Sequence, residues 1–261
     1  MTFQVIGNGT QTMLAFHGFG RDGTDFKTLE PSLGNDFTII SFDLFHHGTS
    51  EIKENNEGTE FNAADLKELI NQYLLIHHTE RFSLLAYSLG GRISLQLIEL
   101  FGDKIDTVLL FAPDGLKYSL MYHFITKTKL GKTMFKQFIT TPGLFFFLLK
   151  LLNKTGIVKN SVFKFLNLQL DTQTKRQRVF DTHLFFRNIH PDLEHVKAII
   201  NTKPIKLHLF FGRHDTIIPP RYGKVFMKGI NDKRALHILD SGHHLIKDSA
   251  NEVLKKILNK P

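Results

Sequence analysis

A single serine, Ser88, stands between small residues at the end of an apolar run in the sequence RFSLLAYSLGGR. The run Phe82–Tyr87 is short and mostly apolar, as expected of a buried strand, and Arg92–Phe101 has helical spacing. Ser88 is therefore predicted at a sharp corner, where only small residues fit two positions away, and Ala86 and Gly90 meet that need. The pattern is a G-x-S-x-G elbow with Ala in the first position. Such an elbow presents a serine hydroxyl at the rim of a parallel sheet, beside a helix N-terminus.

A serine hydroxyl is a poor nucleophile, so it needs a base to take its proton and an acid to hold that base. We expect His243 in LDSGHHLI to be the base, with the adjacent His244 as the alternative. We expect Asp215 in LFFGRHDTIIPP to be the orienting acid. Asp114 is the alternative, although aspartate is common in Pro-Asp-Gly turns for local reasons. Each candidate follows a predicted strand, where ligands bind in open α/β sheets.

The reaction also needs hydrogen-bond donors for a developing oxyanion. We expect the backbone N–H groups of Leu89 and Phe19 to supply them, because the glycines of His17-Gly18-Phe19-Gly20 let the backbone approach closely. Adjacent histidines point in different directions, and no partner stands at helical ligand spacing, so no metal site is expected. No cofactor is expected either.

Short apolar runs alternate with helical segments along the chain. The predicted strands are Met13–Phe16, Phe37–Phe42, Phe82–Tyr87, Thr107–Ala112, Lys206–Phe211 and Ala235–Leu239. The predicted helices among them are Asn62–His77, Arg92–Phe101 and Asn251–Leu258. This alternation predicts an α/β fold with a mostly parallel sheet, and runs that are apolar throughout indicate that helices cover both of its faces.

The alternation stops near residue 115 and resumes near residue 202. Five helices are predicted in between, over Tyr118–Leu130, Lys132–Ile139, Thr141–Leu152, Asn160–Leu170 and Thr172–Asn188. We therefore expect a core of residues 1–114 and 202–261, with an inserted all-helical cap of residues 115–201 that covers the site.

The net charge of +8 is concentrated in that cap. Gly115–Asn201 holds 14 Lys and Arg against 4 Asp and Glu, together with 11 of the 25 Phe, whereas the remainder has 19 against 21. A nucleic-acid binder would not divide its charge in this way, so no nucleic-acid partner is expected. The cap is either a helical layer with a solvated lysine-rich outer face, or a lid that attracts anionic substrates or lies against an anionic lipid surface.

Length and composition limit the remaining possibilities. A chain of 261 residues can bury a substantial core, and the absence of cysteine excludes disulfides and thiol catalysis. The most apolar stretch, Leu144–Leu152, is far shorter than the roughly 20 residues that span a bilayer. No signal peptide is visible, and we expect a soluble cytoplasmic protein without stable membrane insertion.

With these residues in place, the chain resembles the α/β-hydrolase superfamily over nearly its full length. The order Ser88, Asp215, His243 is that of the superfamily. The His17-Gly18 segment and Phe42–Ser50, which is similar to D-x-x-G-H-G-x-S, also fall where the superfamily has them. Two departures are Ala86 in the elbow and Phe45-His46 in place of the usual glycine of the fourth-strand loop.

The resemblance implies a serine hydrolase with a helical cap, acting on a carboxylic ester or related acyl compound. The phenylalanine-rich cap favours an apolar or aromatic substrate, and its charge favours an anionic one. Two alternatives use the same three residues: a hydrolase of C–C bonds in ring-cleavage products, and a lyase of the menaquinone-pathway type. A non-catalytic binding protein that keeps the fold is a third alternative.

Overall fold

The computed structural model describes residues 1–50, 60–117 and 119–258. These residues form two compact units. The core unit contains the described residues 1–50, 63–117 and 189–258, and the helical unit contains residues 60–62 and 119–188.

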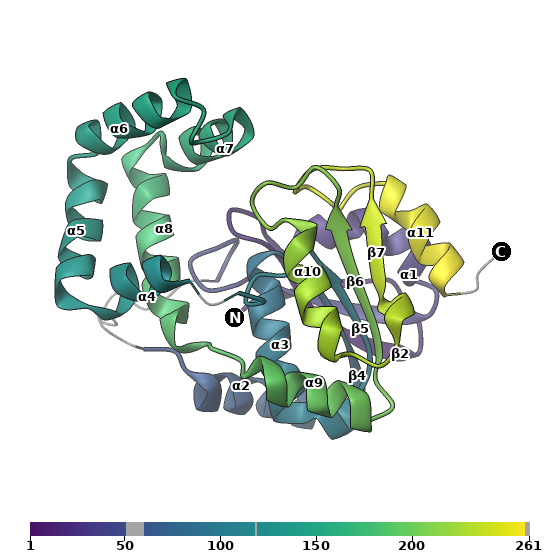
Figure 1. Ribbon diagram of the computed structural model, residues 1–261. Coiled ribbons are helices and arrows are strands. Elements are labelled where there is room, and N and C mark those ends of the chain that lie inside the picture. The colour runs from purple at the N-terminus through teal and green to yellow at the C-terminus, as the bar shows by residue number, and fades with distance from the viewer. Residues whose placement is uncertain (51–59, 118, 259–261) are drawn as a thin grey trace. The chain divides into compact units, whose positions relative to one another are not determined.

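The core unit is built on one twisted sheet (Figure 1). Its strands are β1 (Phe3–Ile6), β2 (Gln11–Phe16), β3 (Phe37–Phe42), β4 (Phe82–Tyr87), β5 (Ile105–Phe111), β6 (Lys206–Gly212) and β7 (Leu236–Leu239). They are ordered β1-β3-β2-β4-β5-β6-β7. β1 pairs with β3 antiparallel, and every other pairing is parallel. The carboxyl ends of β2, β4, β5 and β6 therefore meet at one edge of the sheet.

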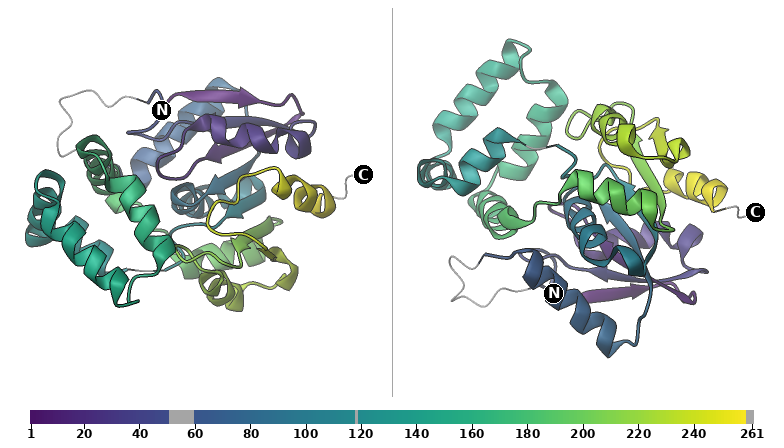
Figure 2. Two further views of the ribbon diagram at one scale, coloured as in Figure 1. Left: turned by 90° about the horizontal axis from the view of Figure 1, so that it is seen from above. Right: turned by 60° about the horizontal axis from the view of Figure 1, so that its bottom comes forward.

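Helices cover both faces of this sheet (Figures 1 and 2). One face carries α1 (Glu30–Leu33) and α11 (Ser249–Ile257), which pack against each other. The other face carries α2 (Ala63–Ile76), α3 (Leu89–Phe101) and α9 (Leu193–Thr202), while α10 (Pro220–Phe226) packs on β6 and β7. Because both faces are covered, all six residues of β4 are buried.

The predicted α/β class with a mostly parallel sheet is confirmed, and several details differ. The helices α1 and α9 were not among the predicted ones. β1 was not predicted, because it is a four-residue edge strand with mixed exposure. α3 begins at Leu89, directly after the serine, and not at Arg92. α10 was not predicted either, and it starts at the second of two consecutive prolines, a residue type well suited to the first turn of a helix.

The helical unit consists of five helices, in agreement with the helical pattern of this segment. They are α4 (Leu120–Lys127), α5 (Lys129–Thr140), α6 (Gly143–Lys154), α7 (Asn160–Leu170) and α8 (Gln173–Phe185). The predicted first helix begins at Tyr118, which lies outside the described residues. Within the described chain, no single helix is long and apolar enough to cross a bilayer, and only α5 and α6 taken together, across a 92° bend, meet that length and composition.

The boundaries of the two units differ from the predicted domain limits of 115–201. The helical unit ends at Asn188, and α9 belongs to the core unit. The reason lies in packing, because α9 buries Val196 and Ile200 and lies against α3. Residues 60–62 belong to the helical unit, where the Phe61 ring stacks on Phe185 at 5.1 Å between centroids.

Candidate active site

Ser88 occupies a strained corner between β4 and α3. Its backbone has φ 49° and ψ −113°, a left-handed φ that costs a residue with a side chain about 1–3 kcal/mol. Four backbone hydrogen bonds hold the corner in place. The Ser88 N–H donates to Phe111 at 2.9 Å, the Ser88 carbonyl accepts from Gly91 and Asp114 at 2.8 Å each, and Gly90 donates to His17 at 3.1 Å. The strain is therefore supported by the two neighbouring strands.

The position two residues after Ser88, occupied by Gly90, has no room for a side chain. A Cβ atom at this position would lie 1.9 Å from the carbonyl oxygen of Phe16, the last residue of β2. The helix and the adjacent strand thus meet backbone against backbone. On the other side of the serine, Ala86 is fully buried in β4, where its small side chain fits.

The structure brings Ser88, His243 and Asp215 together as a hydrogen-bonded chain. The Ser88 Oγ lies 3.1 Å from His243 Nε2, and His243 Nδ1 lies 2.7 Å from Asp215 Oδ2. A carboxylate only accepts hydrogen bonds, so Nδ1 of the ring carries the proton and donates it. In the neutral ring, Nε2 is then the acceptor for the serine hydroxyl. The Asp215 side chain is completely buried, and that of His243 is 14% exposed.

The second oxygen of Asp215 is also fully engaged. Its Oδ1 accepts from the backbone N–H groups of Ile217 and Ile218 at 2.8 and 2.9 Å. The loop after β6 is bonded to the loop after β7, because the Arg213 and His214 N–H groups donate to Leu239 and Ser241 at 2.8 and 2.9 Å. The carboxylate and the imidazole are therefore carried on two loops locked together.

Asp114, the alternative acid, is engaged elsewhere. It follows β5, and its carboxylate forms an ion pair with Arg92 of α3 and accepts from the Gly115 N–H at 2.7 Å. The carboxylate that contacts His243 is that of Asp215.

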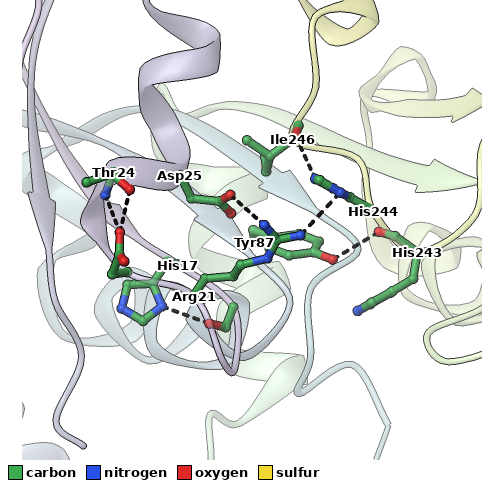
Figure 3. A network of polar contacts seen from close by, with 10 residues as sticks. His17, Arg21, Thr24, Asp25, Tyr87, His243, His244 and Ile246 are labelled. Atoms are coloured by element: carbon green, nitrogen blue, oxygen red, sulfur yellow. Dashed lines mark hydrogen bonds and ion pairs between the residues drawn. The ribbon is translucent and has the colours of Figure 1, made fainter. Parts of the chain in front are cut away.

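His244, the alternative base, faces a different set of partners (Figure 3). Its Nδ1 lies 3.2 Å from Arg21 Nη2, and its Nε2 lies 2.9 Å from the carbonyl oxygen of Ile246. Arg21 only donates and the carbonyl only accepts, so the ring is neutral with its proton on Nε2. Burial, together with the nearby Arg21 charge, lowers the pKa of His244 in agreement with this state.

The glycine-rich loop after β2 packs directly against the serine. A Cβ atom on Gly18 would lie 2.7 Å from the Tyr87 ring and 3.2 Å from Ser88 Cβ. Phe19, the next residue, is therefore held beside the corner, and Leu89 is the first residue of α3. The first N–H groups of a helix have no acceptor within the helix, which suits Leu89 to bind an anion.

His17 fixes this loop from within the core. Its Nδ1 lies 2.7 Å from the Gly18 carbonyl oxygen, and its Nε2 accepts from the Leu44 N–H at 3.0 Å. Complete burial lowers the pKa of His17 to about 4, so the ring is neutral near pH 7. His17 therefore joins the loop after β2 to the loop after β3.

Asp43 organises the second of these loops, the one that resembles D-x-x-G-H-G-x-S. Its Oδ1 accepts from the Gly23 N–H at 2.7 Å, and its Oδ2 accepts from the Thr49 N–H at 2.8 Å. Burial by itself would raise the pKa of Asp43, but the bonds from Thr49 and Gly23 lower it overall. This motif therefore holds the loops together on the side of the sheet edge nearest β2 and β3.

Sequence reasoning missed two side chains that hold the His243 loop. The Tyr87 hydroxyl donates to the His243 carbonyl oxygen at 3.2 Å, and burial raises the pKa of this phenol so that it stays protonated. Arg21 bridges His244 and Asp25, with an Nη1–Oδ1 distance of 3.3 Å to the latter (Figure 3). Tyr87 could have been identified from the sequence, because it directly precedes Ser88. The partners of Arg21 lie too far apart in sequence for any local signal.

The described residues contain no group of three or more His, Asp or Glu side chains arranged to hold a metal ion. The groups that the hydrogen-bonded chain offers for chemistry are a serine hydroxyl, an imidazole and a carboxylate. Such a chain can pass a proton from a hydroxyl to a ring nitrogen while a buried charge stabilises the resulting imidazolium.

Comparison with known proteins agrees with the fold described above. The family model of the alpha/beta hydrolase fold matches residues 11–250. The uncharacterized hydrolase YugF of Bacillus subtilis is 24% identical over 95% of this chain and 88% of its own. An uncharacterized protein of Mycobacterium tuberculosis is 26% identical over 44% of this chain, and the match spans only 32% of that relative's length.

Among solved structures, a thermophilic esterase from Thermogutta terrifontis superimposes with a TM-score of 0.69. The superposition covers 99% of this chain and 91% of the esterase at 18% identity, which establishes a common fold. The family match covers most of the chain, including the segments that carry the serine, the aspartate and the histidine. The chain therefore belongs to the α/β-hydrolase fold family.

Proposed function

We propose that this enzyme is a serine hydrolase that cleaves a carboxylic ester or related acyl compound through an acyl-enzyme intermediate. The observation that carries the proposal is the chain from Ser88 Oγ to His243 Nε2, at 3.1 Å, and from His243 Nδ1 to Asp215 Oδ2, at 2.7 Å. Both distances lie within the range of hydrogen bonds in a charge-stabilised nucleophile–base pair.

In the first half of the reaction, Ser88 Oγ attacks the acyl carbonyl carbon while His243 Nε2 takes the hydroxyl proton. The buried Asp215 carboxylate stabilises the imidazolium through Nδ1, and its bonds from Ile217 and Ile218 keep it oriented. We assign the oxyanion donors to the backbone N–H groups of Leu89 and Phe19. Loss of one such donor costs about 3–4 kcal/mol of barrier stabilisation in comparable sites.

In the second half, His243 gives its proton to the leaving alcohol, and the acyl group remains on Ser88. A water molecule then attacks the acyl carbon and passes a proton to His243 Nε2. Collapse of the second tetrahedral intermediate releases the acid, and the proton returns to Ser88. No group beyond the substrate and water is consumed.

A fluorophosphonate probe tests the nucleophile directly, because it phosphonylates an activated serine. We expect stoichiometric labelling of the intact enzyme and none in Ser88→Ala. Ser94→Ala is a matched control, because Ser94 lies on α3, the helix that follows Ser88, is fully buried and has an Oγ without a hydrogen-bond partner. Labelling that persists in Ser88→Ala would show that the nucleophile lies elsewhere.

A substrate panel tests the reaction class. Esters with short and long acyl chains are compared with a ring-cleavage diketone, whose turnover requires C–C cleavage. We expect turnover of esters. Trace ester hydrolysis beside rapid diketone cleavage would replace the ester proposal, although Ser88, His243 and Asp215 would keep their roles.

A further inference from the structure

The exposed apolar side chains of this protein are concentrated in the helical unit. Sixteen large hydrophobic residues are exposed in the part of the chain that the structure describes, and eleven of them lie between Leu120 and Leu168. The helix α6 contributes the largest group, which consists of Leu144, Phe147, Leu148, Leu151 and Leu152. A protein surface normally scatters such residues singly, so a cluster indicates a binding surface.

These five side chains form one continuous face of α6, which we call the α6 face. Their spacing of three, four, seven and eight residues places them along one side of a helix. Leu149, on the opposite side, is 5% exposed, whereas Leu144 and Phe147 are 70% and 65% exposed. Figure 1 shows α6 joining α5 to α7 at the end of the helical unit opposite α4. The helix is therefore apolar both where it packs and where it faces outward.

The segment that contains the α6 face is rich in positive charge. Residues 119–170 contain eight lysines and no aspartate or glutamate. Lys150 and Lys154 lie three and seven residues after Phe147, which places them along the same edge of the helix, and both are exposed. Four further exposed lysines of this segment are Lys129, Lys136, Lys159 and Lys164.

An occupant of this face must offer apolar surface and negative charge together. The interface of an anionic bilayer does so, because acyl chains accept leucine and phenylalanine while the headgroups attract lysine. A second copy of the chain fits less well. A two-fold contact through the same face would bring Lys150 and Lys154 of both copies together, and like charges repel.

We propose that the α6 face docks this enzyme on anionic lipid surfaces. The helix lies in the plane of the interface, with its leucines and Phe147 among the upper acyl chains and its lysines at the headgroups. Its twelve residues span about 18 Å, well short of the roughly 30 Å hydrocarbon core, so the attachment is peripheral. The proposal concerns a surface, and it stands whether or not the enzyme cleaves esters.

Vesicle co-sedimentation tests the proposal with the full chain. Vesicles of phosphatidylcholine with phosphatidylglycerol are compared with vesicles of phosphatidylcholine alone. We expect the protein to bind the anionic vesicles at least about tenfold more strongly, because each lysine near the surface adds to the attraction. Raising the salt to about 1 M shortens the screening length to about 3 Å and should reduce the binding by a similar factor.

Two double variants locate the binding surface. Phe147→Ser with Leu151→Ser removes apolar contacts, and Lys150→Glu with Lys154→Glu reverses charge; each pair should weaken binding to anionic vesicles about tenfold or more. The matched controls are Leu75→Ser with Ile76→Ser on α2 and Lys255→Glu with Lys256→Glu on α11, all exposed. The controls should bind within about twofold of the unaltered protein. Thermal melts and turnover of a water-soluble ester verify that each variant is folded.

Four outcomes would overturn the proposal. The first is absence of binding to anionic vesicles by the unaltered protein. The second is binding that the α6 variants retain in full. The third is self-association that disappears in Phe147→Ser with Leu151→Ser while vesicle binding is absent, which would assign the face to a second copy. An altered KM for the water-soluble ester in folded α6 variants, with vesicle binding unchanged, would assign the face to the substrate instead.

Discussion

The candidate site in the core unit and the α6 face in the helical unit place polar and apolar side chains in opposite ways. The candidate site buries polar side chains and provides hydrogen-bond partners for them. Asp215, for example, accepts three hydrogen bonds on its two carboxylate oxygens. The helical unit leaves apolar groups outside, as the α6 face shows. Buried polar groups demand exact partners because an unmet one costs about 1–3 kcal/mol. Exposed apolar side chains need no individual partner atoms, and any apolar surface can cover them.

The elbow and the start of α6 also differ in backbone packing, although Gly131 of α5 in the helical unit is as closely packed as Gly90, with a Cβ position 2.0 Å from the Phe124 carbonyl oxygen. In the core unit, Gly90 lies against the carbonyl of Phe16 with no room for a single added carbon. In the helical unit, Gly143 has nothing within 4 Å of where a Cβ would stand. The elbow therefore tolerates no added carbon atom, whereas the exposed start of α6 tolerates one. Matched substitutions in the two units should show which positions require one specific residue and which tolerate a change.

The largest difference that we expect is in kcat/KM, among variants in which different carboxylates are replaced by amides. Asp215→Asn should lower kcat/KM by about 10⁴-fold, because an amide can donate to His243 Nδ1 and favour the wrong ring tautomer. Asp114→Asn, which alters a carboxylate paired with Arg92, should cost less than about tenfold. Asp181→Asn in the helical unit, where the carboxylate accepts from Gln177, should leave turnover unchanged. Steady-state kinetics on one ester measures all three, and equal losses in Asp114→Asn and Asp215→Asn would refute the choice of acid.

The next largest difference that we expect is in folding stability, between alanine substitutions at two glycines. Gly90→Ala forces a carbon into the Phe16 carbonyl, so it should destabilise the protein by about 3 kcal/mol or prevent folding. Gly143→Ala enters open space at the start of α6 and should stabilise by about 0.5 kcal/mol, because it restricts the unfolded chain. Urea unfolding measures both. Similar stability of the two variants would contradict the close backbone contact at the elbow.

The elbow was also the part of the site that the sequence predicted best. Small residues around a serine at a strand end reflect a local steric rule, and Gly90 and Ala86 obey it visibly. The choice between His243 and His244 lies beyond local rules. It depends on Arg21, which is 223 residues away in sequence and holds the His244 ring. The sequence around His243 and His244 does not indicate the contact between His244 and Arg21.

Helix α9 shows a second limit of sequence patterns. Helical periodicity predicted the five helices of the helical unit, but it did not predict α9 and could not assign the residues of α9 to a unit. The spacing of Val196 and Ile200 shows that α9 has an apolar face without showing that the face meets α3. The strand β1 was missed for a related reason, because only its pairing with β3 distinguishes four half-exposed residues from a loop.

Acid should act on the core unit through His17. Burial holds the pKa of His17 at about 4, below its ordinary value of 6.5, so the unfolded chain binds the proton first as the pH falls. Stability should therefore be constant above pH 6.5 and fall by about 3 kcal/mol towards pH 4 on account of this residue. Urea unfolding between pH 7 and pH 4 measures the loss.

The matched variant for this prediction is His17→Asn. It should be less stable at pH 7, since it loses the acceptor for the Leu44 N–H, but its stability should fall less steeply with acid. His208, whose pKa burial also lowers to about 4, changes stability in the same direction. The difference between the two proteins is therefore the informative quantity. Parallel curves between pH 6.5 and pH 4 would exclude His17 as the source.

The smallest difference concerns two tyrosines that make the same bond in the two units. The Tyr87 hydroxyl donates to the His243 carbonyl at 3.2 Å, and the Tyr122 hydroxyl donates to the His183 carbonyl at 3.1 Å. Replacement by phenylalanine should cost about 1 kcal/mol of stability in each case. Only Tyr87→Phe loosens the loop that carries His243, so only this variant should lower kcat, by several-fold, with KM unchanged. Equal effects on kcat in the two variants would mean that the core unit positions its imidazole without Tyr87, and the difference between the units would then rest on Asp215 and the elbow.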